Sequence, residues 1–485
     1  MVKNNFYNTI IKKVNAILVF TFFLSKTIYA QEFKCKQEWA NDKDLKNATL
    51  SYCVINLSNG LVVDELNSHT SVVPASTQKA ITTSAALGIL GPNYKFETKI
   101  YFTGNFNKTT GVLNGDVIIF GNGDPTLQSE YFYKDTVLVT DKWAKILKEK
   151  GLKEIKGKII GDASAWNRNI PPNWIWGDIC NYFGAAPCGL NFFDNKFKII
   201  YNSGAIGSSA KVVDFKPQYA NTQFTINSNV ICKGTEDEAY VTGNPFGYNK
   251  EINGKIPPNK NNYEVEAVLP DPALLCAEML AKSLSKSGVV LNLNNTISNY
   301  KKGDSLISKT LIYTHYSPTL EKIIFHTNLK SNNLYAESIL MALGKGNAYL
   351  GIEATKKYLQ KMGIDHTELY MTDGSGLGRA NTVTTFLQAN LLAKIYKDSL
   401  IYKSFNTSLP VAGVSGSMRS IGKGTKIENN MRAKTGYINR ARGYCGYVNN
   451  ENGDCLAFSV LFNNYNCSAK EAKLKIEKWL VELEE

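Results

Sequence analysis

Two side chains three residues apart, Ser76 and Lys79, could together attack a carbonyl carbon. On a helix this spacing places both on one face, where the hydroxyl and the amine can meet. A serine hydroxyl attacks poorly until a base takes its proton, and lysine can do so where burial or nearby positive charge lowers its pKa. The sequence therefore predicts a nucleophile, Ser76, and a base, Lys79, at a helix amino terminus, which favours developing negative charge.

The Ser-x-x-Lys spacing alone is not specific, because it occurs at four other places in the chain. Each of these is ordinarily a solvated surface pair. Only the Ser76 copy follows Pro74-Ala75 and opens an apolar stretch, where a buried lysine would otherwise be costly. The other pairs are Ser208 with Lys211, Ser283 with Lys286, Ser298 with Lys301, and Ser420 with Lys423.

A second hydroxyl and an amide come from Ser331-Asn332-Asn333, just before a helical stretch that continues from Leu334. In a functional interpretation Ser331 relays a proton and Asn333 donates a hydrogen bond to the substrate backbone. The alternative is that Ser331 caps a helix. Ser404-Phe405-Asn406 fits the same loose pattern, so this motif does not decide by itself.

The third element, Lys434-Thr435-Gly436, lies on a predicted strand and occurs once. Lysine supplies positive charge, threonine a hydroxyl, and glycine lets a substrate approach the backbone closely. An ordinary edge strand would explain these three residues alone. The three elements in this order, each in a suitable context, indicate a serine active site.

The elements that must position these residues come from both ends of the chain. Two strands, Thr49–Leu57 and Leu61–Leu66, flank a tight turn, and a buried helix over Thr77–Leu90 ends at Gly91-Pro92. Three further strands and an amphipathic helix close the chain and would complete the sheet and cover one face. They are Met431–Ile438, Ala441–Val448, Cys455–Asn463 and Ala469–Glu484.

Between these ends, short strand-like pieces separated by Gly, Asn and Pro predict an inserted region over 93–259. It ends in the polar stretch Gly254–Asn262, and helical segments follow it. The predicted organisation is thus 1–30 leader, 31–92 first part of the main domain, 93–259 insertion, and 260–485 second part. The helical segments are Pro272–Ser287, Leu320–Gly344 and Glu353–Met362.

The first thirty residues have the features of a secretory signal peptide, with an uncleaved anchor as the alternative. Lys3, Lys12 and Lys13 precede the apolar run Ala16–Leu24, and Ala30 offers a small residue for cleavage. Both interpretations place the rest outside the cytoplasm, in the periplasm or cell envelope. Without the four leader lysines, the formal charge of +13 falls to +9. This charge favours contact with anionic wall polymers or lipid head groups, whereas the absence of basic-aromatic clusters argues against nucleic acid.

Nine cysteines, all beyond the leader, give no metal-binding spacing. Two pairs, Cys180 with Cys188 and Cys445 with Cys455, are candidate disulfides, with reduced buried thiols as the alternative. The four histidines form neither a metal-binding motif nor a suggested catalytic triad, so we expect no metal and no cofactor. They are His69, His315, His326 and His366.

The three ordered motifs resemble those of penicillin-binding proteins and serine β-lactamases. The gap of 255 residues between Ser76 and Ser331 is longer than a simple lactamase-like domain needs. Four further segments resemble the class C, low-molecular-mass penicillin-binding proteins, the D-alanyl-D-alanine carboxypeptidase/endopeptidase family, over nearly all of the chain beyond the leader. They are Gly121–Leu127, Tyr182–Asp194, Asp373–Arg379 and Leu409–Gly416.

This resemblance implies an α+β fold, with an antiparallel sheet flanked by helices and a large insertion rich in short strands. It also implies roles for ten residues. Ser76 would be acylated and Lys79 would be its base, while Ser331, Asn333 and Lys434 would complete the proton and charge network. Among the substrate-binding residues, Thr435 would bind the terminal carboxylate and Gly436 would let the substrate approach the backbone. The backbone N–H groups of Tyr437 and Ser76 would form the oxyanion hole. Asp178 and Arg379 would hold the free end of the diaminopimelate side chain.

The implied reaction is cleavage of D-alanyl-D-alanine peptides of peptidoglycan through a serine acyl-enzyme, with β-lactam antibiotics as covalent inhibitors. One rival is a β-lactamase, for which we find no acidic deacylation motif. Others are an idle wall-binding or β-lactam-sensing module and a structural envelope protein. The intact Ser76–Lys79 pair argues against the idle module, and a structural protein would leave the three ordered motifs to coincidence. The choice between carboxypeptidase and endopeptidase stays open.

Overall fold

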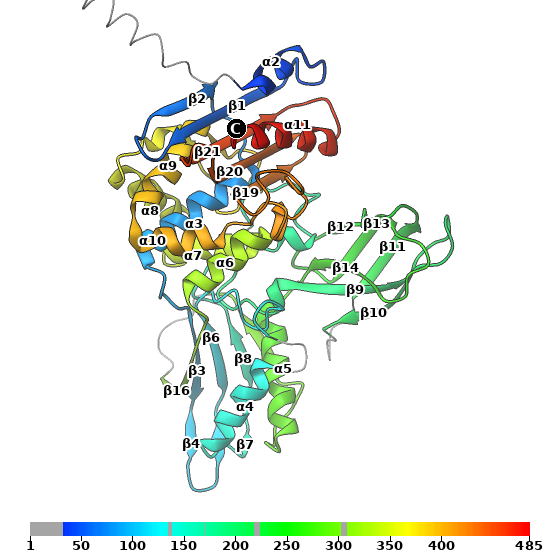
Figure 1. Cartoon of the computed structure of the whole chain (residues 1–485). Helices are drawn as coiled ribbons and strands as arrows, with labels where there is room; N and C mark the ends of the chain where they lie inside the picture. Colours follow the sequence, from blue (N-terminus) through cyan, green and yellow to red (C-terminus); the bar gives the residue numbers. More distant parts are fainter. Residues whose placement is uncertain (1–32, 134–137, 169, 218–223, 302–307) are drawn as a thin grey trace, which may run out of the picture.

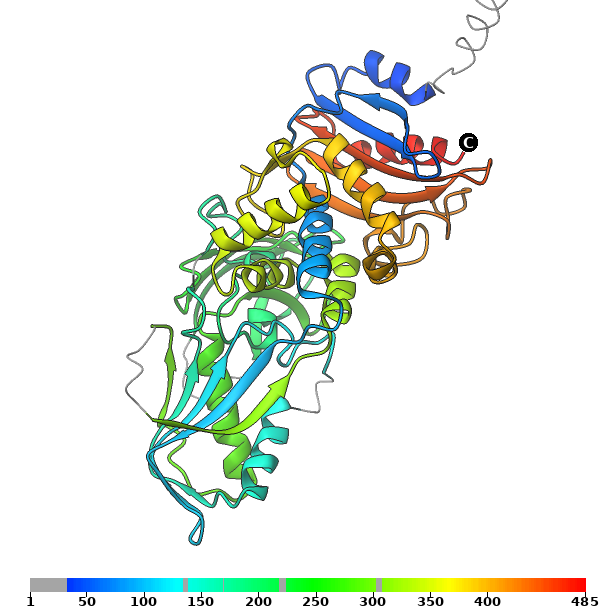
Figure 2. The same ribbon diagram turned by 90° about the vertical axis from the view of Figure 1, so that its left-hand side faces the viewer.

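The computed structural model describes residues 33–133, 138–168, 170–217, 224–301 and 308–485. The predicted signal peptide lies outside this part. The described chain forms a main α+β unit and a long insertion that projects from it, as Figures 1 and 2 show. Among the described residues, no helix combines the length and apolar character needed to cross a bilayer.

The main unit is built on a five-stranded antiparallel sheet of order β19-β20-β21-β1-β2. The central pairing joins the two ends of the chain, since Cys53 of β1 lies opposite Ser459 of β21. All five strands were predicted within a residue or two. Their bounds are β1 Thr49–Asn56, β2 Val62–Leu66, β19 Arg432–Ile438, β20 Ala441–Asn449 and β21 Cys455–Asn463.

Helices cover both faces of this sheet (Figure 1). On one face, α2 (Lys34–Asn41) and α11 (Ala469–Glu482) bury an aromatic cluster around Trp39 and Trp479. The other face packs against α9, with α3 at the centre of the remaining helices. These are α3 Lys79–Leu90, α6 Leu320–Lys330, α7 Asn333–Leu343, α8 Ala348–Lys361, α9 Thr385–Lys397 and α10 Ser399–Ser408.

Two predicted helices differ from those observed. The single helix expected over Leu320–Gly344 is two helices, α6 and α7, because Ser331 adopts a left-handed conformation with φ 57°. The helix expected over Glu353–Met362 starts at Ala348, because the Asn347 side chain accepts a hydrogen bond from the backbone N–H of Leu350 and caps it.

The insertion contains a second five-stranded sheet, of order β15-β8-β6-β3-β16, which packs against α4 and α5. Three short strands, β4, β5 and β7, form a small sheet at its tip (Figure 1). The bounds are β3 Glu97–Thr103, β4 Asn105–Asn107, β5 Val112–Asn114, β6 Val117–Gly121, α4 Val139–Glu149, β7 Glu154–Ile155, β8 Ile159–Asp162, α5 Pro272–Lys286, β15 Thr296–Asn299 and β16 Lys309–Tyr316.

A smaller part of the insertion consists of two three-stranded sheets, β10-β9-β14 and β11-β13-β12. These sheets lie to one side of the main unit in Figure 1. Their bounds are β9 Lys196–Asn202, β10 Lys211–Lys216, β11 Thr225–Cys232, β12 Tyr240–Gly243, β13 Asn249–Ile256 and β14 Tyr263–Val268.

The insertion extends beyond its predicted end at Asn259. Strand β16 pairs along its length with β3, with Lys309 opposite Thr103 and Tyr316 opposite Glu97. The polar stretch Gly254–Asn262, which we interpreted as a domain boundary, comprises the end of β13 and its connection to β14 within the insertion. The end of the insertion is therefore set by the pairing of β16 with the distant strand β3, and not by the polar composition of the chain.

All nine cysteines lie in the described part of the chain, and none is bonded to another. In the register of β20 and β21, Cys445 lies opposite Ser459 and Cys455 opposite Asn449, so the two cysteines do not face each other. The Cys180 and Cys188 thiols instead donate hydrogen bonds to backbone carbonyls. The structure thus agrees with the alternative of reduced thiols.

Candidate active site

Ser76 lies in a 3-10 turn, Ala75–Gln78, that leads directly into α3. Lys79, the first residue of α3, is completely buried, and its Nζ lies 2.8 Å from Ser76 Oγ. Lys79 Nζ also donates to Asn333 Oδ1 at 2.6 Å and to the Ser375 carbonyl at 2.7 Å. The predicted hydroxyl–amine pair is therefore in contact, and every acceptor around the amine is uncharged.

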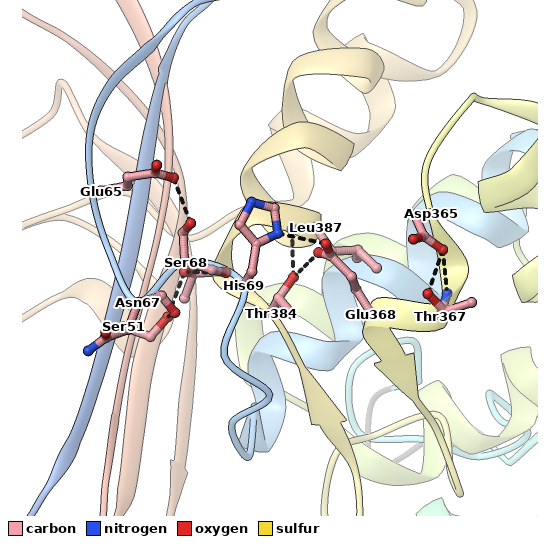
Figure 3. Close-up of polar contacts among 11 residues, drawn as sticks. Ser51, Glu65, Asn67, Ser68, His69, Asp365, Thr367, Glu368, Thr384 and Leu387 are labelled. Atoms are coloured by element: carbon pink, nitrogen blue, oxygen red, sulfur yellow. Dashed lines mark hydrogen bonds and ion pairs between the residues drawn. The ribbon is translucent and has the colours of Figure 1, made fainter.

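The segment that leads into Ser76 is held from outside the site (Figure 3). His69 Nδ1 lies 2.7 Å from Glu368 Oε1, and the other oxygen of Glu368 accepts from the Thr384 hydroxyl. Thr384 is also the N-cap of α9, since its Oγ1 accepts from the backbone N–H of Leu387. These contacts tie the chain before the nucleophile to the hairpin of β17 (Leu369–Tyr370) and β18 (Thr382–Val383).

Two non-glycine residues of the site have left-handed backbone conformations, Ala75 with φ 47° and Ser331 with φ 57°. Such conformations are costly for residues with a side chain and persist only where the surroundings impose them. Ser331 ends α6, and the side chain of Asn332, not of Ser331, caps α7 by accepting from the N–H of Tyr335. The Ser331 hydroxyl is therefore available to the site.

Lys434 on β19 is the second completely buried lysine of the site. Its Nζ donates to Ser331 Oγ at 2.9 Å and to the Thr435 carbonyl at 2.7 Å. The Thr435 hydroxyl contacts Ser417 Oγ at 2.8 Å on the exposed side of the strand. The alternative copy of the second motif lies elsewhere, because Ser404 on α10 bonds to Glu321 of α6.

Gly436 was expected to let the substrate approach the strand closely. In the structure it is the chain around Ser76 that approaches Gly436. A Cβ atom at Gly436 would lie 2.6 Å from the Pro74 carbonyl oxygen and 2.9 Å from the Thr77 nitrogen. Strand β19 can therefore lie directly against the turn that holds Ser76. The next residue, Tyr437, is half exposed, and the Arg442 guanidinium sits 4.7 Å from its ring centre.

Burial lowers the pKa of both lysines. It holds the pKa of Lys79 well below its usual 10.5, with a further decrease from the positive charge of Lys434. Burial likewise lowers the pKa of Lys434 to about 7. A lysine amine in this state can accept a proton near neutral pH, as a base for serine must.

Asp178 and Arg379, predicted as a pair, form an ion pair of 2.9 Å between Asp178 Oδ2 and an Arg379 guanidinium nitrogen. Both line one cavity of about 880 Å³, together with Ser76, Ser331 and Asn333. The insertion, which carries Asp178, supplies one wall of this cavity. Its residues there include Glu130, Tyr131, Tyr182, Asp194, Lys196 and Glu266.

Sequence reasoning named the segment Asp373–Arg379 without explaining it, and it overlooked Glu337. Asp373 is buried and accepts hydrogen bonds from the N–H groups of Gly376 at 2.8 Å and Gly378 at 2.7 Å. It also accepts from Trp174 Nε1 at 2.9 Å, which ties the segment to the insertion. Asp373 thus shapes the turn that presents the Ser375 carbonyl to Lys79.

Comparison with known proteins gives this site its context. The model of the D-Ala-D-Ala carboxypeptidase 3 (S13) family matches residues 36–485. The chain belongs to this family. Membership makes it a D-alanyl-D-alanine carboxypeptidase, a serine-type peptidase and hence a hydrolase, as the resemblance of the motifs implied.

Two carboxypeptidase relatives cover most of this chain. D-alanyl-D-alanine carboxypeptidase DacB of Haemophilus influenzae is 25% identical over 89% of this chain and 88% of its own length. D-alanyl-D-alanine carboxypeptidase of Actinomadura sp. strain R39 is 25% identical over 88% of this chain and 79% of its own length. The family likeness therefore includes the insertion.

The fold is similar to that of crystalline penicillin-binding protein 4 from Haemophilus influenzae, with a TM-score of 0.77 and 22% identity. That structure covers 94% of this chain, and the match spans 100% of its own length. The predicted α+β architecture is thus confirmed. Within the described residues, no group of three His, Cys, Asp or Glu side chains could hold a metal ion.

Proposed function

We propose that this carboxypeptidase cleaves the terminal D-alanine from peptidoglycan stem peptides in two steps, with Ser76 as nucleophile and Lys79 as base. The observation that carries the proposal is the 2.8 Å contact between Ser76 Oγ and a completely buried Lys79 amine. A buried amine whose acceptors are uncharged favours its neutral form, which can take the serine proton.

In the first step, Lys79 Nζ removes the Oγ proton while Oγ bonds to the carbonyl carbon of the penultimate D-alanine. The backbone N–H groups of Ser76 and Tyr437 stabilise the oxyanion. The proton passes through Ser331 and Lys434 to the leaving nitrogen, and D-alanine departs. Water then attacks the ester and gives a proton to Lys79 Nζ, which passes it to Ser76 Oγ as the ester bond breaks and the shortened peptide leaves. Asn333 orients Lys79 through the contact of 2.6 Å and can donate to the peptide backbone.

The substrate carboxylate binds beside Lys434 and the partly exposed Thr435 hydroxyl. Asp178 and Arg379 form a complementary pair on the cavity wall. A free ammonium and carboxylate at the end of the third residue's side chain fit this pair, because each can replace one partner of the existing ion pair.

We further propose that the protein is exported, on the strength of its leader sequence, and acts in the periplasm or cell envelope. The formal charge of +9 that remains without the four leader lysines favours peripheral contact with anionic wall polymers or membrane head groups. β-Lactams would acylate Ser76 as substrate mimics. The penicillin-binding protein 4 of Haemophilus influenzae has been crystallised with a β-lactam.

Benzylpenicillin tests the nucleophile directly. The purified protein without its leader, incubated with the antibiotic and digested, should yield one adduct on the peptide that contains Ser76. The variant Ser76→Ala should give none, while its thermal unfolding stays the same. A folded sample without any adduct would reject the catalytic proposal in favour of a wall-binding module. An adduct that disappears within seconds would instead favour a β-lactamase.

A further inference from the structure

Glu337 is a buried carboxylate near the active site that belongs to none of the three motifs. It lies on α7, one helical turn after Asn333, and only 3% of its surface is exposed. A buried charged group of this kind needs partners, because desolvation of a carboxylate is costly. Its partners therefore indicate what it does.

The partners of Glu337 are backbone N–H groups of the turn that contacts Lys79. Glu337 Oε1 accepts from Ser375 N at 2.7 Å, and both carboxylate oxygens lie 3.0 Å from Gly374 N. The carbonyl of the same Ser375 accepts from Lys79 Nζ at 2.7 Å. A single peptide segment thus connects the Glu337 carboxylate to the amine of Lys79.

Four titratable groups from four parts of the fold face one another here. Glu337 comes from α7, Lys79 from α3, Lys434 from β19 and Asp373 from the turn. Lys434 lowers the pKa of Lys79, after the larger effect of burial, whereas the carboxylates of Glu337 and Asp373 oppose both effects. Burial, followed by the neighbouring Asp373 carboxylate, raises the pKa of Glu337 to about 8.

From this geometry we propose that Glu337 is a positioning residue that holds the Gly374–Ser375 turn against Lys79 and sets the strength of that lysine as a base. The inference rests on the proposed role of Lys79. An ionised Glu337 holds the two N–H groups more firmly than the acid form does. Its negative charge also increases the proton affinity of Lys79.

The rate of acylation should therefore depend on the protonation of Glu337. Above about pH 8 the carboxylate forms, Lys79 becomes a stronger base, and the first-order acylation rate at saturating benzylpenicillin should rise. In Glu337→Gln the part of this rise near pH 8 should be missing, while any change near pH 7 that follows Lys434 remains. The variant should match the natural protein at pH 6.5 and acylate about three- to ten-fold more slowly at pH 9.

Two further variants separate charge from shape. Glu337→Asp keeps a titratable carboxylate on a shorter side chain, so acylation should slow at every pH while the rise remains. Glu353→Gln removes a partly exposed glutamate from the neighbouring helix α8, where it pairs with Lys356, and should change nothing. If Glu337→Gln slowed acylation equally at all pH values, Glu337 would have only a structural role and the inference would be wrong. An unchanged acylation rate in both Glu337 variants would also overturn it.

Carbon NMR of the unaltered protein labelled at glutamate carboxyls and lysine Cε gives an independent test. One glutamate should titrate near pH 8, far from the ordinary value of about 4.3, and the Lys79 signal should shift with it. A Lys79 signal that ignores this titration would overturn the inference. The measurement needs no turnover and no variant that folds, so it separates this inference from the proposed reaction.

Discussion

The main unit and the insertion, which both line the cavity of Ser76, hold lysines in opposite surroundings. In the main unit, Lys79 and Lys434 are completely buried and donate to hydroxyl, amide and carbonyl oxygens. On the wall formed by the insertion, Lys196 of β9 lies 2.7 Å from Glu130 and 2.8 Å from Glu266. The same side chain is thus placed among neutral oxygens on one side and among carboxylates on the other.

Because of this difference in partners, the pKa of the lysine is lowered in the main unit and raised in the insertion. Burial lowers the pKa of Lys434 to about 7. The carboxylates of Glu266, Asp194 and Glu130 instead outweigh burial at Lys196 and raise its pKa. A buried lysine therefore acts as a base or as a permanent cation according to whether carboxylates accompany it. The three predictions below test this comparison.

The largest effect should follow from Lys79→Met, which removes the base but keeps the volume. We expect acylation by benzylpenicillin to slow by about 1,000-fold, because serine loses the group that takes its proton. The thermal midpoint should stay the same or rise, since a buried amine without a carboxylate partner costs folding energy. Stopped-flow acylation and calorimetry measure the two quantities. A large fall in the thermal midpoint would show that Lys79 stabilises the fold, as an ion-paired lysine does.

A smaller effect concerns the charge of Lys434. Since its pKa is lowered to about 7, Lys434 loses its proton as pH rises through 7, and the attraction for a substrate carboxylate weakens. The KM for a D-alanyl-D-alanine peptide should therefore increase about ten-fold between pH 6 and pH 9. In Lys434→Arg, whose guanidinium stays charged, KM should be independent of pH even if kcat falls. A KM that rises equally in both proteins would assign the titration to another group.

The strands of the main sheet and the Ser76–Lys79 contact were predicted from local patterns in the sequence. The strands around Cys53 and Ser459 alternate or run apolar, and the Ser76–Lys79 spacing fixes a contact within one turn of chain. A contact of this kind needs no knowledge of the rest of the fold. This is why the strands and the Ser76–Lys79 contact could be predicted without the structure.

What the sequence could not supply depends on contacts between distant residues. From the sequence, Glu337 looks like an ordinary glutamate on a helix. Its role becomes visible only when the structure places Gly374 and Ser375 beside it. Ser331 interrupts the helix because its backbone is left-handed, and the spacing of apolar residues in the sequence gives no sign of this. The end of the insertion was likewise hidden, since β16 returns to β3 across the whole insertion.

The smallest effect on activity should come from Lys196→Met, on the wall that the insertion supplies. Lys196 is mostly buried, with 13% of its side chain exposed, whereas Glu130 is 40% exposed and stays hydrated without its partner. The loss of the lysine should therefore cost about 1–3 kcal/mol of unfolding free energy, less than for a fully buried pair. Benzylpenicillin acylation should stay within two-fold, because the cation contributes no proton to Ser76. Urea unfolding checks the first value and stopped-flow the second, with Lys196→Arg as the control that keeps the charge. If Lys196→Met were as stable as the control but slow to acylate, the lysine would belong to the reaction, and the contrast between the two walls would be lost.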